Sequence, residues 1–128
     1  MEIKSNQSGF FADFDYGRLD ISTGENTGFR PCQLMIASIA ACSGAVFRRI
    51  LEKKRLHLED LTIKAKEERL PEEANRIKSI HFHFILKGKG LRTETIEKAL
   101  QAAMKNCAMA KSVENSIDMK KTFDIIHS

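Results

Sequence analysis

The chain has few of the residues that mark specialised protein classes. It contains no tryptophan, one tyrosine, two prolines and three cysteines among 128 residues. Three cysteines are too few, and odd in number, for a secreted domain held together by disulfides. The low glycine and proline content excludes a fibrous or disordered chain. The length predicts a single domain over residues 1–128.

Charge and hydropathy exclude further classes. The net charge of +4 is too small to predict a nucleic-acid partner by itself. The first seven residues are mostly polar and mixed in charge, unlike a signal peptide, and no uninterrupted apolar run reaches the ~20 residues that span a bilayer. We therefore expect a cytoplasmic protein that binds neither nucleic acid nor membrane.

The N-terminal region has the pattern of short strands. Every second residue from Phe10 to Tyr16 is apolar or small, which predicts a half-buried strand. Residues 22–29 contain two glycines and polar side chains, so we expect a loop there.

An uncharged segment follows Pro31. Residues 32–47 are mostly good helix formers, and proline is favoured in a first helical turn. A helix that is apolar on all sides is typically buried. We predict a buried helix about 24 Å long, too short to span a membrane, that ends near Arg48 and Arg49. One sheet cannot cover all its sides, so two such helices are expected to pack together in a dimer.

The second half alternates between strand and helix patterns. Alternating apolar residues from Leu61 predict one strand, and those from Ile80 to Leu86 predict the dry face of another. A helix with Thr93 as its N-cap, a short helix through Val113 and a last strand over residues 117–125 are expected next. Strands linked by hairpins predict an antiparallel α+β protein.

Two cysteines lie on helical surfaces that we expect to face the core. Cys42 is in the middle of the uncharged helix, and Cys107 ends the apolar stripe of the later helix. Free cysteine is often a buried, inert residue, but a reactive thiolate can also work with a second, resolving thiol. The sequence does not give the distance between them. No cation lies within one helical turn of Cys42, so an activating cation has to come from elsewhere in the fold.

Two segments resemble the cysteine motifs of the OsmC/Ohr family. Residues 31–42, which end at Cys42, resemble the first motif, and residues 106–112, which include Cys107, resemble the second. The resemblance covers nearly the whole chain. It implies an OsmC-like fold, with antiparallel sheets around two central helices in an intertwined homodimer. It also implies thiol-dependent reduction of organic hydroperoxides without a cofactor, with Cys42 peroxidatic, Cys107 resolving and a dithiol reductant such as a lipoylated protein.

Three positions depart from the family pattern. Cys32 stands where strongly active members carry a glutamate, and Ala108 replaces the usual proline. The family also uses an N-terminal arginine to hold the thiolate. The candidates here are Arg18 and Arg30, with Glu25 as a supporting carboxylate. These features are closest to the shorter OsmC-like branch.

A second interpretation keeps the fold without the catalysis. The protein would then be a binding or redox-sensing module, with an apolar groove at the dimer interface. An arginine near Cys42 would favour the enzyme, whereas apolar atoms alone would favour the module. His81 and His83 have a spacing that can bind metal, but no further ligand is evident, so we expect a polar outer sheet face and no metal site.

Overall fold

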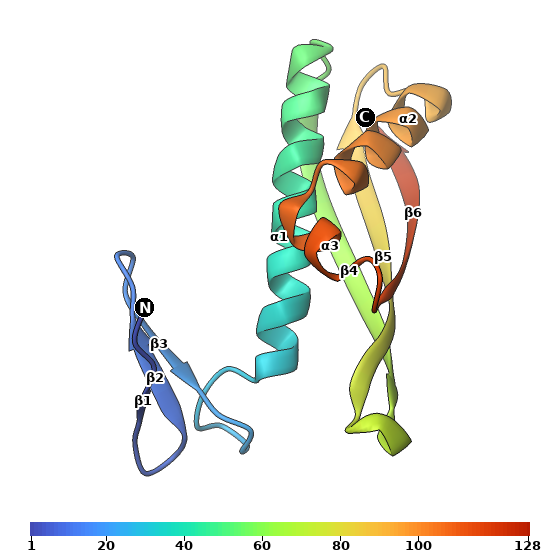
Figure 1. The fold of residues 1–128 in the computed structure, drawn as a ribbon. Coiled ribbons are helices and arrows are strands. Elements are labelled where there is room, and N and C mark those ends of the chain that lie inside the picture. The colour runs from blue at the N-terminus through green and yellow to red at the C-terminus, as the bar shows by residue number, and fades with distance from the viewer. The chain divides into compact units, whose positions relative to one another are not determined.

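The computed structural model describes residues 1–128, and the chain forms two compact units, Met1–Ala37 and Ser38–Ser128. The first unit contains three short antiparallel strands in the order β1-β2-β3: β1 (Lys4–Ser5), β2 (Phe10–Asp13) and β3 (Arg18–Ile21). Helix α1 (Pro31–Lys53) begins in this unit and continues into the second. The colours of Figure 1 follow this order along the chain.

The strand predicted through Tyr16 is shorter in the structure. Strand β2 ends at Asp13 because Phe14 and Gly17 exchange backbone hydrogen bonds of 3.0 and 3.1 Å, which close a hairpin turn. Ala12 is buried, whereas Phe14 and Tyr16 are exposed. The alternation therefore continues past the strand without marking a dry face.

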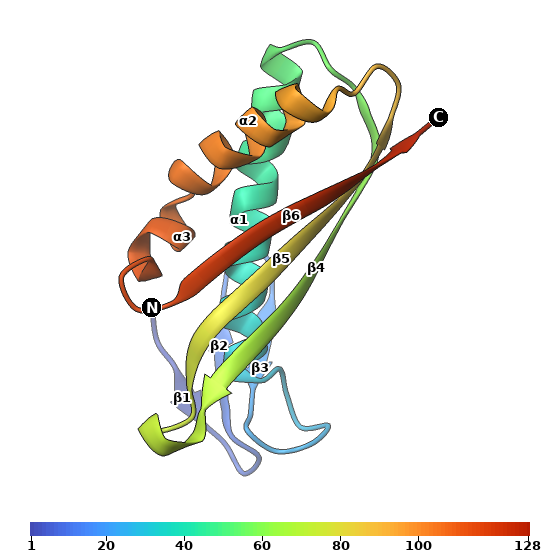
Figure 2. The same cartoon turned by 90° about the vertical axis from the view of Figure 1, so that its right-hand side faces the viewer.

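The second unit is a three-stranded sheet with helices on one face (Figure 2). After α1 it contains, in order, β4 (Leu58–Leu70), the 3-10 turn η1 (Pro71–Glu73), β5 (Arg76–Gly88), α2 (Thr93–Lys105), α3 (Ala108–Val113) and β6 (Asp118–His127). Strands β4 and β5 form an antiparallel hairpin, as expected.

The pairing of β6 contradicts the prediction of antiparallel sheets, because β6 runs parallel to β5. The chain leaves β5, passes through α2 and α3 across one face of the sheet, and returns to the end where β5 began (Figure 2). A connection of this kind produces a parallel pair. The architecture is thus mixed α+β, with two sheets and three α-helices.

The core of the second unit confirms the predicted dry face of β5. Ile80, Phe82, Phe84 and Leu86 are all buried. Helix α1 packs on this face through a stripe spaced by three or four residues: Ile39, Ser43, Gly44, Phe47 and Leu51. The Phe47 and Phe84 rings meet edge to face, with centroids 5.7 Å apart.

Helix α1 is longer than predicted and is not buried on all sides. It has 23 residues, so the prediction that it is too short to span a membrane was wrong about its length. By length and composition it could cross a bilayer, but a core helix passes the same test. Only 28% of its most apolar window is buried. Much apolar surface on this helix therefore has no cover within the chain.

Candidate active site

A break between α2 and α3 positions Cys107. Helix α2 ends at Lys105, and the Asn106 side-chain amide and backbone N–H donate to the Ala102 carbonyl oxygen, at 2.8 and 3.0 Å. Cys107 then takes an extended conformation as the N-cap of α3. The prediction that Cys107 ends the apolar stripe of the later helix was therefore wrong, because that helix ends at Lys105, two residues before Cys107, and Cys107 caps a new helix.

The Cys107 thiol is fully buried and held on two sides. Its sulfur accepts a hydrogen bond from the Ala110 N–H at 3.4 Å and donates to the Ile39 carbonyl oxygen at 3.9 Å. The Ser43 hydroxyl donates to the same carbonyl, and it opposes the increase in the pKa of Cys107. Burial raises the pKa of the Cys107 thiol, and the hydrogen bond with Cys42 adds to the increase. Cys107 is consequently the thiol that ionises less readily.

Cys42 lies against Cys107 but in a different environment. Helix α1 presents its half-buried side chain beside the start of α3, where the Met109 and Ala108 N–H groups donate to its sulfur. The Met109 N–H and the Cys107 thiol are the main causes that lower the pKa of Cys42, and partial burial opposes them. Cys42 is therefore the thiol that ionises more readily.

Each of the two sulfurs interacts with different N–H groups of the first turn of α3. The first N–H groups of a helix have no partner within the helix. Here Ala108 and Met109 donate to Cys42, and Ala110 donates to Cys107. Both cysteines are free thiols, and each shifts the pKa of the other. The structure thus places a thiol whose pKa is lowered next to one whose pKa is raised, an arrangement that suits disulfide chemistry.

An arginine that the sequence interpretation missed also acts on Cys42. The positive charge of Arg49 lowers the pKa of Cys42, although it is the smallest of the causes. Arg49 follows Cys42 by seven residues, or two helical turns, so both project from the same side of α1. The sequence contains this spacing, but Arg49 lies beyond the single helical turn over which a cation near Cys42 was expected.

The other predicted supporting residues belong to the first unit. Arg18 is 3.0 Å from the Asp20 carboxylate, and its guanidinium lies 3.9 Å from the centre of the Phe11 ring. Arg30 precedes α1 and its carbonyl accepts the Leu34 N–H, while Glu25 is exposed in a loop. Their roles beside Cys42 remain predictions, as does the assignment of Cys32 to the family's glutamate position.

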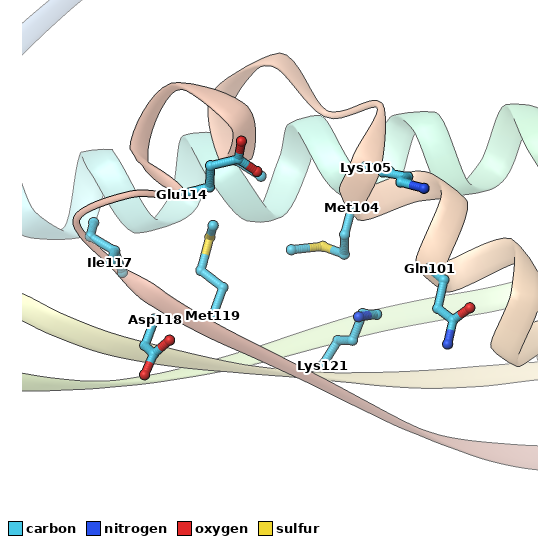
Figure 3. A pocket seen from close by; sticks show the side chains of 9 residues that line it. Gln101, Met104, Lys105, Glu114, Ile117, Asp118, Met119 and Lys121 are labelled. Carbon is cyan, nitrogen blue, oxygen red and sulfur yellow. The ribbon is translucent and has the colours of Figure 1, made fainter.

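A groove lies between α2, α3 and the start of β6 (Figure 3). Its volume is about 490 Å³, and Met104 and Met119 face each other across it, with Lys105 and Lys121 on its rim. Ala110, whose N–H holds the Cys107 sulfur, also lines this groove. The groove therefore borders the helix α3 that supports both thiols.

Comparisons with known proteins agree with this geometry. The family model described as OsmC-like protein matches residues 24–121. Protein YhfA from Escherichia coli K12 is 25% identical over 97 residues, which cover 75% of this chain and 72% of YhfA.

Solved structures show the same fold. A hypothetical protein from Aquifex aeolicus superposes with a TM-score of 0.88 at 23% identity, over 99% of this chain and 95% of that protein. An organic hydroperoxide resistance protein OsmC from Legionella pneumophila has a TM-score of 0.75 at 20% identity, over 96% and 93% of the two chains. At these identities the likeness establishes the fold.

Proposed function

The chain belongs to the OsmC-like protein family, and on this premise we propose that it reduces organic hydroperoxides with the thiols of Cys42 and Cys107. The single observation that carries the proposal is the contact between two free thiols whose pKa values shift in opposite directions. The resistance to organic hydroperoxides named for the Legionella relative supports the choice of substrate.

The first step oxidises Cys42. Its thiolate attacks the distal oxygen of the hydroperoxide, so that an S–O bond forms and the O–O bond breaks. The alkoxide takes a proton and leaves as an alcohol, and Cys42 becomes a sulfenic acid. The sulfur loses two electrons and the peroxide gains them. The N–H groups of Met109 and Ala108 favour this step because they stabilise the attacking thiolate.

The second step closes a disulfide. The sulfur of Cys107 attacks that of Cys42, the S–O bond breaks, and the hydroxyl leaves as water with the thiol proton. An external dithiol then restores both thiols by exchange. A lipoylated protein is the reductant that the family resemblance suggests, and we place the reaction in the cytoplasm, where free thiols persist.

We further propose that the active form is an intertwined homodimer. The incomplete burial of the apolar window of α1 supports this, because a second copy would remove its half-buried side chains from water. Light scattering should give twice the chain mass of 14.5 kDa. A mass of one chain would contradict the dimer without affecting the thiol chemistry.

A single-turnover experiment tests the mechanism. The reduced protein receives one equivalent of cumene hydroperoxide and is quenched, and its disulfides are mapped by mass spectrometry. We expect a rapid intramolecular Cys42–Cys107 bond. Cys42→Ser should abolish peroxide consumption, whereas Cys107→Ser should stop at a Cys42 sulfenic acid that dimedone traps. Cys32→Ser is the matched control and should behave as the parent protein.

The rival function predicts a different result. In a binding or sensing module the thiols would remain reduced, or would oxidise slowly without pairing. That outcome would contradict the two-cysteine mechanism and leave the family fold intact. The position of Arg49 favours the enzyme, because a cation acts on Cys42 in addition to apolar neighbours.

A further inference from the structure

A chain of four hydrogen-bonded side chains crosses the face of the second sheet that the helices leave open. His81 Nε2 lies 2.7 Å from the Thr122 hydroxyl oxygen, and His83 Nδ1 lies 2.6 Å from the same oxygen. On its other side, His83 Nε2 lies 3.0 Å from the Asp124 carboxylate. The histidines belong to β5 and their partners to β6, so the parallel pairing of these strands creates the cluster.

When the His83 ring is neutral, its contact with Asp124 sets the direction of the other hydrogen bonds. An ionised carboxylate can only accept, so His83 Nε2 carries the proton and donates to Asp124. Nδ1 of the neutral ring is then an acceptor, and the Thr122 hydroxyl donates to it. His81 Nε2 donates to the remaining lone pair of the hydroxyl oxygen. The Thr122 proton is thereby directed at a base that a carboxylate orients.

This is the arrangement that activates a hydroxyl nucleophile. In acyl-transfer enzymes a carboxylate fixes the tautomer of a histidine, which removes the proton of an attacking hydroxyl. We propose that Thr122 is a second nucleophilic site of this protein, which accepts the acyl group of activated esters. The site is independent of the proposed thiol chemistry and lies outside the residues that contact Cys42 and Cys107.

The surroundings of Thr122 suit such a reaction. Thr122 is exposed, the Asp124 side chain is 75% exposed and that of His83 is 28% exposed, so a substrate can reach the hydroxyl. Strand register places Lys64 opposite His83, and Lys66 and Lys120 on either side of His81. These cations favour the negative charge that develops on an attacked carbonyl oxygen. No group of three potential ligands is arranged to hold a metal ion, so the histidines are not explained as a metal site.

The reaction balances without an additional reagent. The Thr122 oxygen attacks the ester carbonyl, a new C–O bond forms, and the hydroxyl proton passes to His83 Nδ1. The original ester C–O bond then breaks and the alcohol leaves with that proton. Water, deprotonated by the same nitrogen, releases the acid and restores Thr122.

An alkyl fluorophosphonate tests the nucleophile directly, because it phosphonylates activated hydroxyls with loss of fluoride. We expect an adduct on Thr122 in the parent protein, located by peptide mass spectrometry, and an equal rate in Cys42→Ser. Asp124→Asn should slow labelling by roughly tenfold or more, since the histidine tautomer is then no longer fixed. Asp118→Asn changes a carboxylate on the same strand that does not contact His83, and should leave the rate unchanged.

Two results would overturn the proposal. One is labelling of Thr122 no faster than that of Thr62, an exposed threonine on the same face of β4. The other is a Thr122 rate that is the same in Asp124→Asn and Asp118→Asn. Both carboxylates are exposed, so these variants should fold, and circular dichroism would verify this.

Discussion

Cys42 and Cys107 are the same side chain in two different environments, and at the residue scale this difference creates the site. The two N–H groups that reach Cys42 stabilise a negative charge, whereas burial of Cys107 penalises one. A substitution near Cys42 should therefore change the rate of its oxidation, and a substitution near Cys107 should change the rate of disulfide closure. Each should leave the rate of the other step unchanged.

The first prediction concerns pH. The pKa of Cys42 is lowered from an ordinary value of 9.0 and that of Cys107 is raised. Since the thiolate is the reactive form, iodoacetamide should modify Cys42 at lower pH than Cys107. The two rates, followed by mass spectrometry across a pH series, check the order. Equal pH profiles for the two thiols would contradict the assignment of roles.

A charge substitution tests the cation that the sequence interpretation missed. Arg49→Gln should raise the pKa of Cys42 and slow its alkylation near neutral pH by roughly two- to threefold, because an exposed charge has a modest effect. Arg48→Gln is the matched control, since it removes the same charge one residue away, and should have no effect. The difference should decrease in high salt. An equal response of both variants would show that Arg49 acts only through net charge.

Ser43 should affect the second step alone. Its hydroxyl stabilises the ionised form of Cys107, so Ser43→Ala should raise the pKa of that thiol further. We expect slower disulfide closure after oxidation and an unchanged rate of sulfenic acid formation. Stopped-flow measurement of the two phases separates these rates. A slower first phase would mean that Ser43 also supports Cys42.

At the scale of elements, the site depends on how closely α1 approaches β4. A Cβ atom added at Gly44 would lie 2.9 Å from the terminal methyl of Ile63. That distance is shorter than a normal van der Waals contact, but the methyl is the end of a flexible side chain. Glycine at this position therefore keeps α1 near the sheet and Cys42 beside α3.

A double-mutant cycle measures this contact. Ile63→Val removes the methyl group and should lower the free energy of unfolding by about 0.5–1.5 kcal/mol in the parent protein. In the Gly44→Ala background it should cost less, because the same change relieves the clash, and we expect a coupling of about 1 kcal/mol. Ile85→Val is the control, since Ile85 lies on the opposite face of the sheet. Additive effects in denaturant unfolding would contradict the close approach.

Element boundaries show what local sequence can predict. The alternation from Ile80 to Leu86 identified the buried face of β5, because burial of one face imposes a period of two. The break at Asn106 was missed, since the apolar spacing continues from α2 to Cys107 while the backbone does not. The predicted N-cap of α2, Thr93, is one residue too late. Thr93 is the first residue of the helix, and Arg92 is the N-cap, although its side chain makes no capping hydrogen bond.

At the scale of the molecule, long-range pairing was the part that sequence could not supply. The direction of β6 depends on the route through α2 and α3, which no residue within β6 encodes. The meeting of Cys42 and Cys107 depends on the same crossover. The motif resemblance nevertheless indicated both cysteines, because each motif is local and their order along the chain identifies the family.

Hydrogen exchange should rank the strands of the second sheet by the protection of their backbone amides. Strand β5 is paired on both edges, whereas β4 and β6 each have one open edge. We expect the Phe82 and Phe84 amides to exchange most slowly, and those of the two-residue strand β1 to exchange rapidly. Mass spectrometry of peptides after deuterium labelling checks the ranking. Protection of β6 equal to that of β5 would indicate a further strand at its open edge.

The parallel strand β6 also has a consequence for biosynthesis. It pairs with residues about forty positions earlier, as Asp118 does with Ser79, and it is synthesised after α1, β4, β5, α2 and α3. The hairpin of β4 and β5 can form earlier, because its strands are neighbours in the chain. Until β6 has emerged, strand β5, whose inner face forms the core of the second unit, has an unpaired edge, which is a template for aggregation. Nascent chains of this protein should therefore be most dependent on chaperones after β5 and before β6 has emerged.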